Sequence, residues 1–194
     1  MDAYHLSAYQ LIERYEAGDR NFERLDLREY QLANLNMPGA QLKQSDFASA
    51  NLKQACLDNA NISGATLWRT NLRNASLRGA NLHQAVMVRC DAARANFSGA
   101  CLHRTDLRLA NLQLTCFANC DLRGTKFSYC DLRGADFTGA DLTGADLTGA
   151  NIQGVRMDDA CLHAVVIGSQ QANNLTMPQA PPRSLPEQPT LTAV

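Results

Sequence analysis

The sequence predicts an all-β solenoid, in which the chain winds into stacked polygonal coils. A large apolar residue recurs at every fifth position from Phe22 to Ile167, which makes 30 units without an insertion, and only Ala92 departs from the pattern. A small residue recurs two positions before it, and Gly or Asn often recurs two positions after it. Five residues match neither the period of an α-helix, 3.6, nor that of a β-strand, 2.0. A turn must therefore recur in every unit.

The small position is the second inward-facing position of the repeat. From Ala40 onward it holds Ala in most units, and the exceptions are Ser, Thr, Cys or Val. A position that accepts nothing larger is sterically confined, as expected where two backbone segments pass close together in a packed interior. The other three positions are mostly polar, so we expect them to face solvent. This accounts for 45% hydrophobic residues with only 6% aromatics.

The turn position follows the large apolar residue by two. It holds ten of the twelve glycines, together with Asn34, Asn59, Asn74 and Asn119. Gly and Asn are the residues that best tolerate a positive φ. The segment from Met37 to Ala40 reads Met-Pro-Gly-Ala, which places Pro and Gly at the two central positions of a type II turn.

The stretch ADFTG-ADLTG-ADLTG-ANIQG, residues 135–154, resembles the pentapeptide-repeat family, whose pattern is A(D/N)LXX. The resemblance covers about three quarters of the chain. It implies a right-handed quadrilateral β-helix, in which four pentapeptides close one square coil with Leu and Ala inside. The 30 units would then form about 7.5 coils, a rod roughly 36 Å long at the ~4.8 Å spacing of paired strands.

We divide the chain into an N-terminal capping segment (1–20), the β-helix (21–169) and a Pro-rich tail (170–194). Ser7 and Gln10 fit a helix capping box, and Gly18 fits a helix stop, so we expect a helix from about residue 8 to 17. A helix there would cover the open first coil, which otherwise exposes unpaired backbone groups. A leader of this type resembles those of small cytoplasmic family members in photosynthetic bacteria.

The C-terminal segment has a different composition. Five of the six prolines fall within the last seventeen residues, which predicts disorder. Val165, Val166 and Ile167 would leave an apolar end on the final coil. Two alternatives remain for this end: either the first part of the tail lies across it, or two such ends pair into a homodimer.

Charge and hydropathy exclude several classes of partner. The first twenty residues include Asp2, Glu13 and Arg14 and lack the apolar run of a signal peptide. No stretch approaches the roughly 18 apolar residues of a membrane-spanning helix. The net charge is -1 and the pI is near 6.4, unlike a strongly basic nucleic-acid-binding domain. We therefore expect a cytoplasmic protein that binds neither membranes nor nucleic acid directly.

The sequence predicts no metal and no cofactor. No two of the seven cysteines differ by 20, the number that would stack them on adjacent coils, and C-x-x-C is absent. Cys90 and Cys130 differ by 40, roughly 9.6 Å, which exceeds the ~7 Å between Cα atoms that a disulfide allows. His83 and His103 do differ by 20 and should stack, but no carboxylate or thiol in their column completes a tetrahedral site.

Enzymatic activity is also disfavoured. Catalysis needs converging groups in a concave site, and a rod filled with Leu offers no such site. The sequence contains neither G-x-S-x-G nor H-x-E. We therefore expect a protein that acts through its surface.

One such function, implied by the resemblance, is imitation of duplex DNA to bind a type II topoisomerase (gyrase). Residues 60–110 contain seven arginines and two aspartates, whereas residues 121–159 contain seven aspartates and four basic residues. A mimic should carry acidic residues along one side for much of its length. Asp131, Asp136, Asp141 and Asp146 instead fall one on each face of a coil, so this remains the alternative.

The favoured hypothesis is a non-enzymatic scaffold or regulator that binds an as yet unidentified protein partner. Sorting outward residues by their number modulo 20 places most of the bulky ones on one face, in four successive coils. An apolar stripe with arginines and the only Trp is typical of a protein-binding surface. The competing interpretation is neutral drift on a solvated face. We call this set the bulky face: Trp68, Arg69, Val86, Val88, Arg89, Arg108, Leu109, Lys126 and Tyr129.

Overall fold

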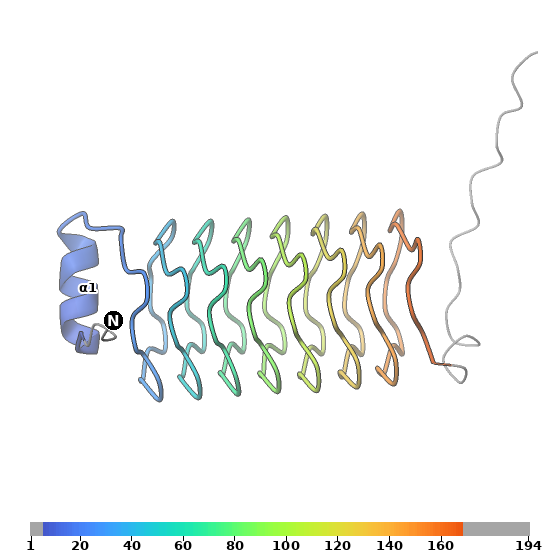
Figure 1. Ribbon diagram of the computed structural model, residues 1–194, viewed down its shortest axis with the longest axis horizontal. Coiled ribbons are helices and arrows are strands. Elements are labelled where there is room, and N and C mark those ends of the chain that lie inside the picture. The colour runs from blue at the N-terminus through green and yellow to red at the C-terminus, as the bar shows by residue number, and fades with distance from the viewer. Residues whose placement is uncertain (1–5, 169–194) are drawn as a thin grey trace, which may run out of the picture.

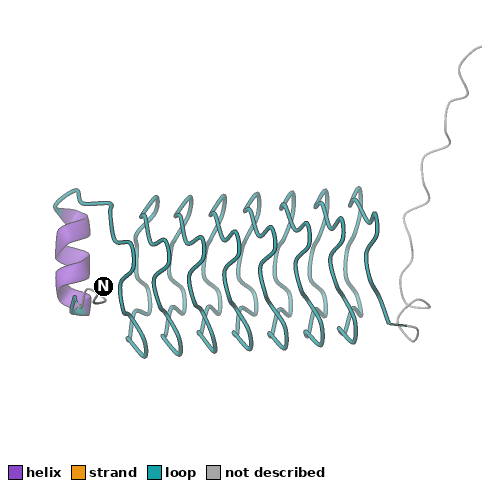
Figure 2. Cartoon of the chain, in the orientation of Figure 1, coloured by secondary structure: helices purple, strands orange, loops and turns teal. Residues whose placement is uncertain are grey.

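The computed structural model describes residues 6–168, and the proposed tail, 170–194, lies outside the described residues. Helix α1 (Ala8–Glu16) is followed by a rod of stacked coils (Figure 1). In the described part of the chain, α1 is the one helix, and it is too short and too polar to cross a membrane. The coils are drawn as loop in Figure 2 because their strand segments are single bridging residues.

Each coil contains twenty residues. Parallel β-bridges join residues that differ by 20, from Asn21↔Gln41 to Asp146↔Val166. The bridging residue of each unit directly precedes the large apolar residue. Four pentapeptides therefore make one coil, a number that the sequence period alone does not give.

Backbone hydrogen bonds link each coil to both of its neighbours. Leu42 N donates to Asn61 O over 2.7 Å, and Asn61 N donates back to Ala40 O over 2.9 Å. A further bond joins the turns, since Gln44 N donates to Ser63 O over 3.0 Å. This ladder repeats along the rod and fixes the position of every outward side chain relative to those one coil away.

The predicted turn recurs in every unit. Ala40 N donates to Met37 O over 3.3 Å, and Gly39, between them, has a φ of 72°. Every fifth residue from Arg24 to Ala164 likewise has a positive φ. The turn is therefore imposed by the fold even where the residue is neither Gly nor Asn.

The two inward phases form one continuous core of Leu, Ala and Phe along the rod. Polar residues at the small position remain hydrogen-bonded there. Thr105 Oγ1 donates to Leu82 O over 2.8 Å, and the Sγ of Cys120 donates to Phe97 O over 2.9 Å. Small size is thus combined with a donor aimed at the preceding coil, which explains why Thr and Cys replace Ala at this position.

The cysteines are free thiols. Cys90, Cys120 and Cys130 are buried at the small position, and the other four lie at the bridging position. Burial raises the pKa of Cys120 and of Cys130 to about 12, so these thiols stay protonated and unreactive near neutral pH. Their role is therefore packing and hydrogen bonding.

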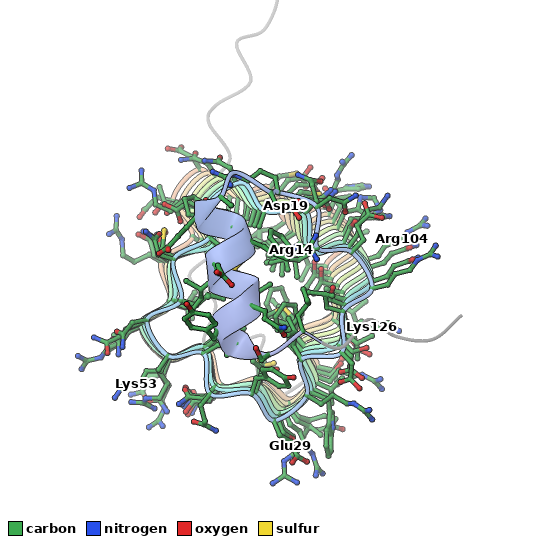
Figure 3. The ribbon with its side chains drawn as sticks, turned by 90° about the vertical axis from the view of Figure 1, so that its left-hand side faces the viewer. Arg14, Asp19, Glu29, Lys53, Arg104 and Lys126 are labelled. Atoms are coloured by element: carbon green, nitrogen blue, oxygen red, sulfur yellow. The ribbon has the colours of Figure 1, made fainter. Side chains whose placement is uncertain are left out.

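Helix α1 lies across the first coil, as the view along the rod shows (Figure 3). Its capping box joins Ser7 and Gln10 as predicted, and Leu11 is fully buried. The hydroxyl of Tyr15 donates to Pro38 O over 2.7 Å, which ties the helix to the rod. Leu25, at a position where Ala later predominates, is buried in the same core.

Candidate functional site

The structure places the bulky face along one corner of the rod. Its residues fall into three columns, and within a column successive coils place residues whose sequence numbers differ by 20. The parallel bridges Val86↔Asp106 and Asp106↔Lys126 belong to one of these columns. In Figure 3 the corner column begins at the labelled Glu29 and runs away from the viewer. Trp68 is 40% exposed and Tyr129 is 64% exposed.

Four successive positions of this corner carry a large residue in a left-handed backbone conformation. The φ angles are 54° at Arg69, 60° at Arg89, 62° at Leu109 and 59° at Tyr129. This region costs a non-glycine residue about 1–2 kcal/mol. The next residue in the column is Gly149, the type of residue that relieves this strain.

The ring of Tyr129 leans toward the C-terminal end of the rod and lies over Gly149. A Cβ added to Gly149 would lie 2.5 Å from Cδ1 of Tyr129, too close for any side chain. The glycine therefore makes room for the ring. The tyrosine is held against backbone on one side and exposes its other side to solvent.

Arg108 differs from the other arginines of the bulky face, because its charge is already paired. Its Nε donates to Oδ1 of Asp106 over 2.8 Å, and its Nη2 donates to Oδ2 over 2.7 Å. Burial raises the pKa of Asp106, but the hydrogen bonds from Arg108 outweigh it, and the pKa ends below its usual value. Sequence reasoning missed this pair, whose signal is Asp and Arg two residues apart within one pentapeptide.

The same Asp-x-Arg pairing recurs along the rod. Arg123 binds Asp121 and Arg133 binds Asp131 with two hydrogen bonds each, at 2.7–2.9 Å. The hydrogen bond from Arg133 is the main cause that lowers the pKa of Asp131, and Arg123 does the same for Asp121. These charges neutralise one another on the surface.

Arg69 and Arg89 form no ion pair within residues 6–168. The guanidinium carbon of Arg69 lies 5.2 Å from the centroid of the Trp68 ring, a cation–π contact that also orients the arginine. Arg89 is exposed one coil further along. Three more arginines between residues 69 and 104 also lack an ion pair in the described structure: Arg78, Arg94 and Arg104. Arg104 projects into solvent in Figure 3.

The aspartates of residues 121–159 are mostly paired. Besides the two Asp-x-Arg pairs, Arg156 lies 3.4 Å from Asp136 and 3.7 Å from Asp158, and Arg123 lies 3.9 Å from Asp141. Seven aspartates against four basic residues leave this end of the rod a net charge of -3, part of which is drawn into these contacts.

The predicted histidine stack is present, with the ring centroids of His83 and His103 5.3 Å apart. A carboxylate from the adjacent column approaches it, since Oδ2 of Asp121 lies 4.0 Å from Nδ1 of His103. That carboxylate is already engaged by Arg123. No group of three or more side chains suited to holding a metal occurs within the part of the chain that the structure describes.

Two hollows lie where α1 meets the first coil. Ile12, Tyr15 and Leu35 contribute to the lining of one, and Arg14 and Phe22 contribute to the other. Neither lining includes a residue of the bulky face.

The stacked coils of four five-residue units, with turns at a positive φ and a Leu and Ala core, define a class of β-solenoids. The family model for pentapeptide repeats matches eight copies, in overlapping segments between residues 26 and 163. The chain therefore belongs to the pentapeptide-repeat family, whose members fold into a right-handed quadrilateral β-helix. Members of this family are generally structural or binding scaffolds.

Several solved structures are similar to this chain. HetL, a pentapeptide repeat protein involved in heterocyst differentiation regulation in Nostoc sp. strain PCC 7120, is 25% identical over 85% of this chain and 98% of its own, with a TM-score of 0.33. The protein alr5209, also from Nostoc, is 26% identical over 84% and 96%, with a TM-score of 0.36. QnrB1, a plasmid-mediated fluoroquinolone resistance protein, is 18% identical over 79% and 86%, with a TM-score of 0.38. No curated protein sequence matches the chain.

Proposed function

We propose that this protein is a non-enzymatic, cytoplasmic scaffold or regulator that binds a partner protein through the bulky face. The observation that carries the proposal is the run of four large residues in the left-handed conformation at one corner: Arg69, Arg89, Leu109 and Tyr129. A positive φ recurs in every unit of the rod, so what distinguishes this corner is the size of the side chains that it carries in four successive coils. Glycine occupies many equivalent positions elsewhere on the rod, so the fold itself does not require these residues.

Recognition would occur on a rigid surface. The backbone ladder holds adjacent coils in register, and the hydrogen bond from Tyr15 to Pro38 ties α1 to the rod. A partner that binds such a surface loses little of this chain's conformational entropy. Trp68, Tyr129 and the two arginines are the residue types that dominate protein-binding hot spots.

A pull-down from the native cell tests this proposal. The bait is the full chain, either wild type or with Trp68→Ala, Arg89→Glu and Tyr129→Ala combined. The matched control changes another corner through Leu114→Ala and Arg94→Glu, which are also an exposed apolar residue and an arginine at a positive φ. We expect a partner that the wild type and the control capture and the first variant loses. Equal capture by all three proteins would contradict the proposal.

The alternative, a DNA mimic that inhibits gyrase, requires free acidic groups along the rod. Arg123, Arg133 and Arg156 engage most of the aspartates that would supply them. A gyrase supercoiling assay separates the two functions. Inhibition of gyrase by the purified chain would favour the DNA mimic over the scaffold that binds a partner through the bulky face.

A further inference from the structure

We propose that the corner of the bulky face binds an acidic segment of its partner, with carboxylates at Arg69 and Arg89 and an apolar side chain at Leu109 and Tyr129. This inference rests on the proposed function and adds the chemistry of the partner. Two observations support it: Arg69 and Arg89 form no ion pair in the described structure, and the corner changes from arginine to apolar residues toward its C-terminal end.

The free arginines of the bulky face lie in two adjacent coils, and its lysine, Lys126, lies between Asp106 and Asp146 in the bridging column. Arg108 is neutralised by Asp106, whereas Arg69 and Arg89 form no ion pair in residues 6–168. Arg28, on the N-terminal side of the same strip, pairs with Asp26 and lies 3.8 Å from Asp46. Arg69 and Arg89 therefore lie between Arg28 and Arg108, two arginines of the same side of the rod whose charges are paired with aspartates.

The two arginines are spaced to share an anion. Arg69 N donates to Val88 O and Arg89 N donates to Arg108 O, so their backbones lie on consecutive coils, ~4.8 Å apart. Two arginines on adjacent backbones can reach the same anion, and the planar guanidinium binds carboxylates with two parallel hydrogen bonds. Trp68 beneath Arg69 restricts the guanidinium and lowers the entropy cost of binding.

The second half of the corner is apolar. Leu109 is 48% exposed, and Tyr129 is fixed over Gly149 with its outer side open. The centre of this apolar half lies two coils from the centre of the arginine half, about 10 Å away. An extended chain spans that distance in about three residues. The partner's carboxylates and its apolar residue should therefore lie within a few residues of each other.

The neighbouring charges favour a protein over a nucleic acid. Asp46 and Asp146 occupy bridging positions of the same face on either side of the arginine pair. A phosphate backbone that ran along the length of this face would approach both of these carboxylates. Leu109 and Tyr129 give an apolar side chain of a peptide a contact that a phosphate backbone cannot use.

The test selects ligands from a phage-displayed library of random peptides, with the purified full chain as bait. The baits are wild type, Arg69→Gln/Arg89→Gln, and the matched control Arg94→Gln/Arg104→Gln, which removes two free arginines at other corners. We expect the wild type and the control to enrich peptides that combine Asp or Glu with an aromatic or aliphatic residue. The affinity of such a peptide, measured by fluorescence anisotropy, should fall about 10-fold in Arg69→Gln/Arg89→Gln and less than about 2-fold in the control.

Three outcomes would overturn the inference: no enrichment, enrichment of peptides without acidic residues, or tighter binding of labelled duplex DNA than of the selected peptides. A selected peptide whose affinity is equal in all three proteins would do the same. If the pull-down still shows capture through the bulky face while the selection gives neutral peptides, the proposed function stands and only the acidic chemistry fails. Circular dichroism of each variant verifies that the coils remain folded.

Discussion

Replacing Arg89 with glycine should stabilise the protein and weaken its binding at the same time. Arg89 has a φ of 60°, and its exposed side chain forms no ion pair with any described residue. Glycine removes the left-handed strain, about 1–2 kcal/mol, while the greater freedom of glycine in the unfolded chain costs about 0.4–1 kcal/mol. The net gain in the free energy of unfolding should be about 0.5–1 kcal/mol.

The assay is urea unfolding followed by circular dichroism, with Arg78→Gly as the matched control. Arg78 is also an exposed arginine without an ion pair in the described structure, but it lies one position before the turn glycine, where φ is not positive. Glycine at position 78 relieves no strain and only increases the conformational entropy of the unfolded chain, so the unfolding midpoint of Arg78→Gly should fall. If Arg89→Gly also lowers the midpoint, the strain argument is wrong.

Three further predictions concern the rest of the rod. Leu77→Ala, in the fully buried core, should lower the free energy of unfolding by about 2–5 kcal/mol in the same urea assay, and a loss below about 1 kcal/mol would show that the coil collapses around the cavity. Arg123 lowers the pKa of Asp121 in the folded state, so the contribution of Asp121 to stability is complete above its unfolded pKa, near 3.8, and is lost as the pH falls through the folded pKa. The urea concentration at the unfolding midpoint should therefore decrease when the pH is lowered below about 4. In Asp121→Asn this decrease should be less steep. If two C-terminal coils pair, Val165→Asp should convert a dimer to a monomer in sedimentation velocity, and a wild-type monomer would contradict the pairing.

The sequence predicted the parts of the fold that depend on the identity of single residues. The large apolar phase, the small phase and the turn at Gly39 follow from steric limits that act within one pentapeptide. The number of units in a coil depends instead on bonds between residues 20 apart, and a period of five does not encode it. It came from resemblance to the family and is now seen in the bridges.

For the candidate site, the sequence predicts which residues share a face but not which of their charges are paired. Columns of residues 20 apart placed Trp68 and Tyr129 on one corner, because the register contains no insertion. The pairing of Arg108 with Asp106 was missed, since charges were counted over long segments and not within each unit. The positive φ at Arg69 and Arg89 follows from the turn predicted in every unit, although neither residue type favours that conformation.

Asp and Asn at the bridging position have a structural role that changes how the acidity of the family pattern is interpreted. Asp46 Oδ1 accepts a hydrogen bond from Ala48 N over 2.9 Å, and Asn61 Oδ1 accepts one from Ser63 N over 3.2 Å. Asn forms this turn as well as Asp does, so the turn does not require a charge. An aspartate here is thus weak evidence for DNA mimicry.

The acidity available to a partner is what remains once the aspartates paired with arginine are set aside. Three arginines cannot offset the five aspartates they contact, so residues 121–159 keep a net charge of -3, whereas residues 60–110 carry +5. The unpaired arginines of these coils are spread over several corners of the rod, and Arg69 and Arg89 are the ones that lie beside the exposed Trp68 on the corner with four large residues at a positive φ. An acidic protein partner satisfies all three features, whereas an acidic DNA mimic would use none of them.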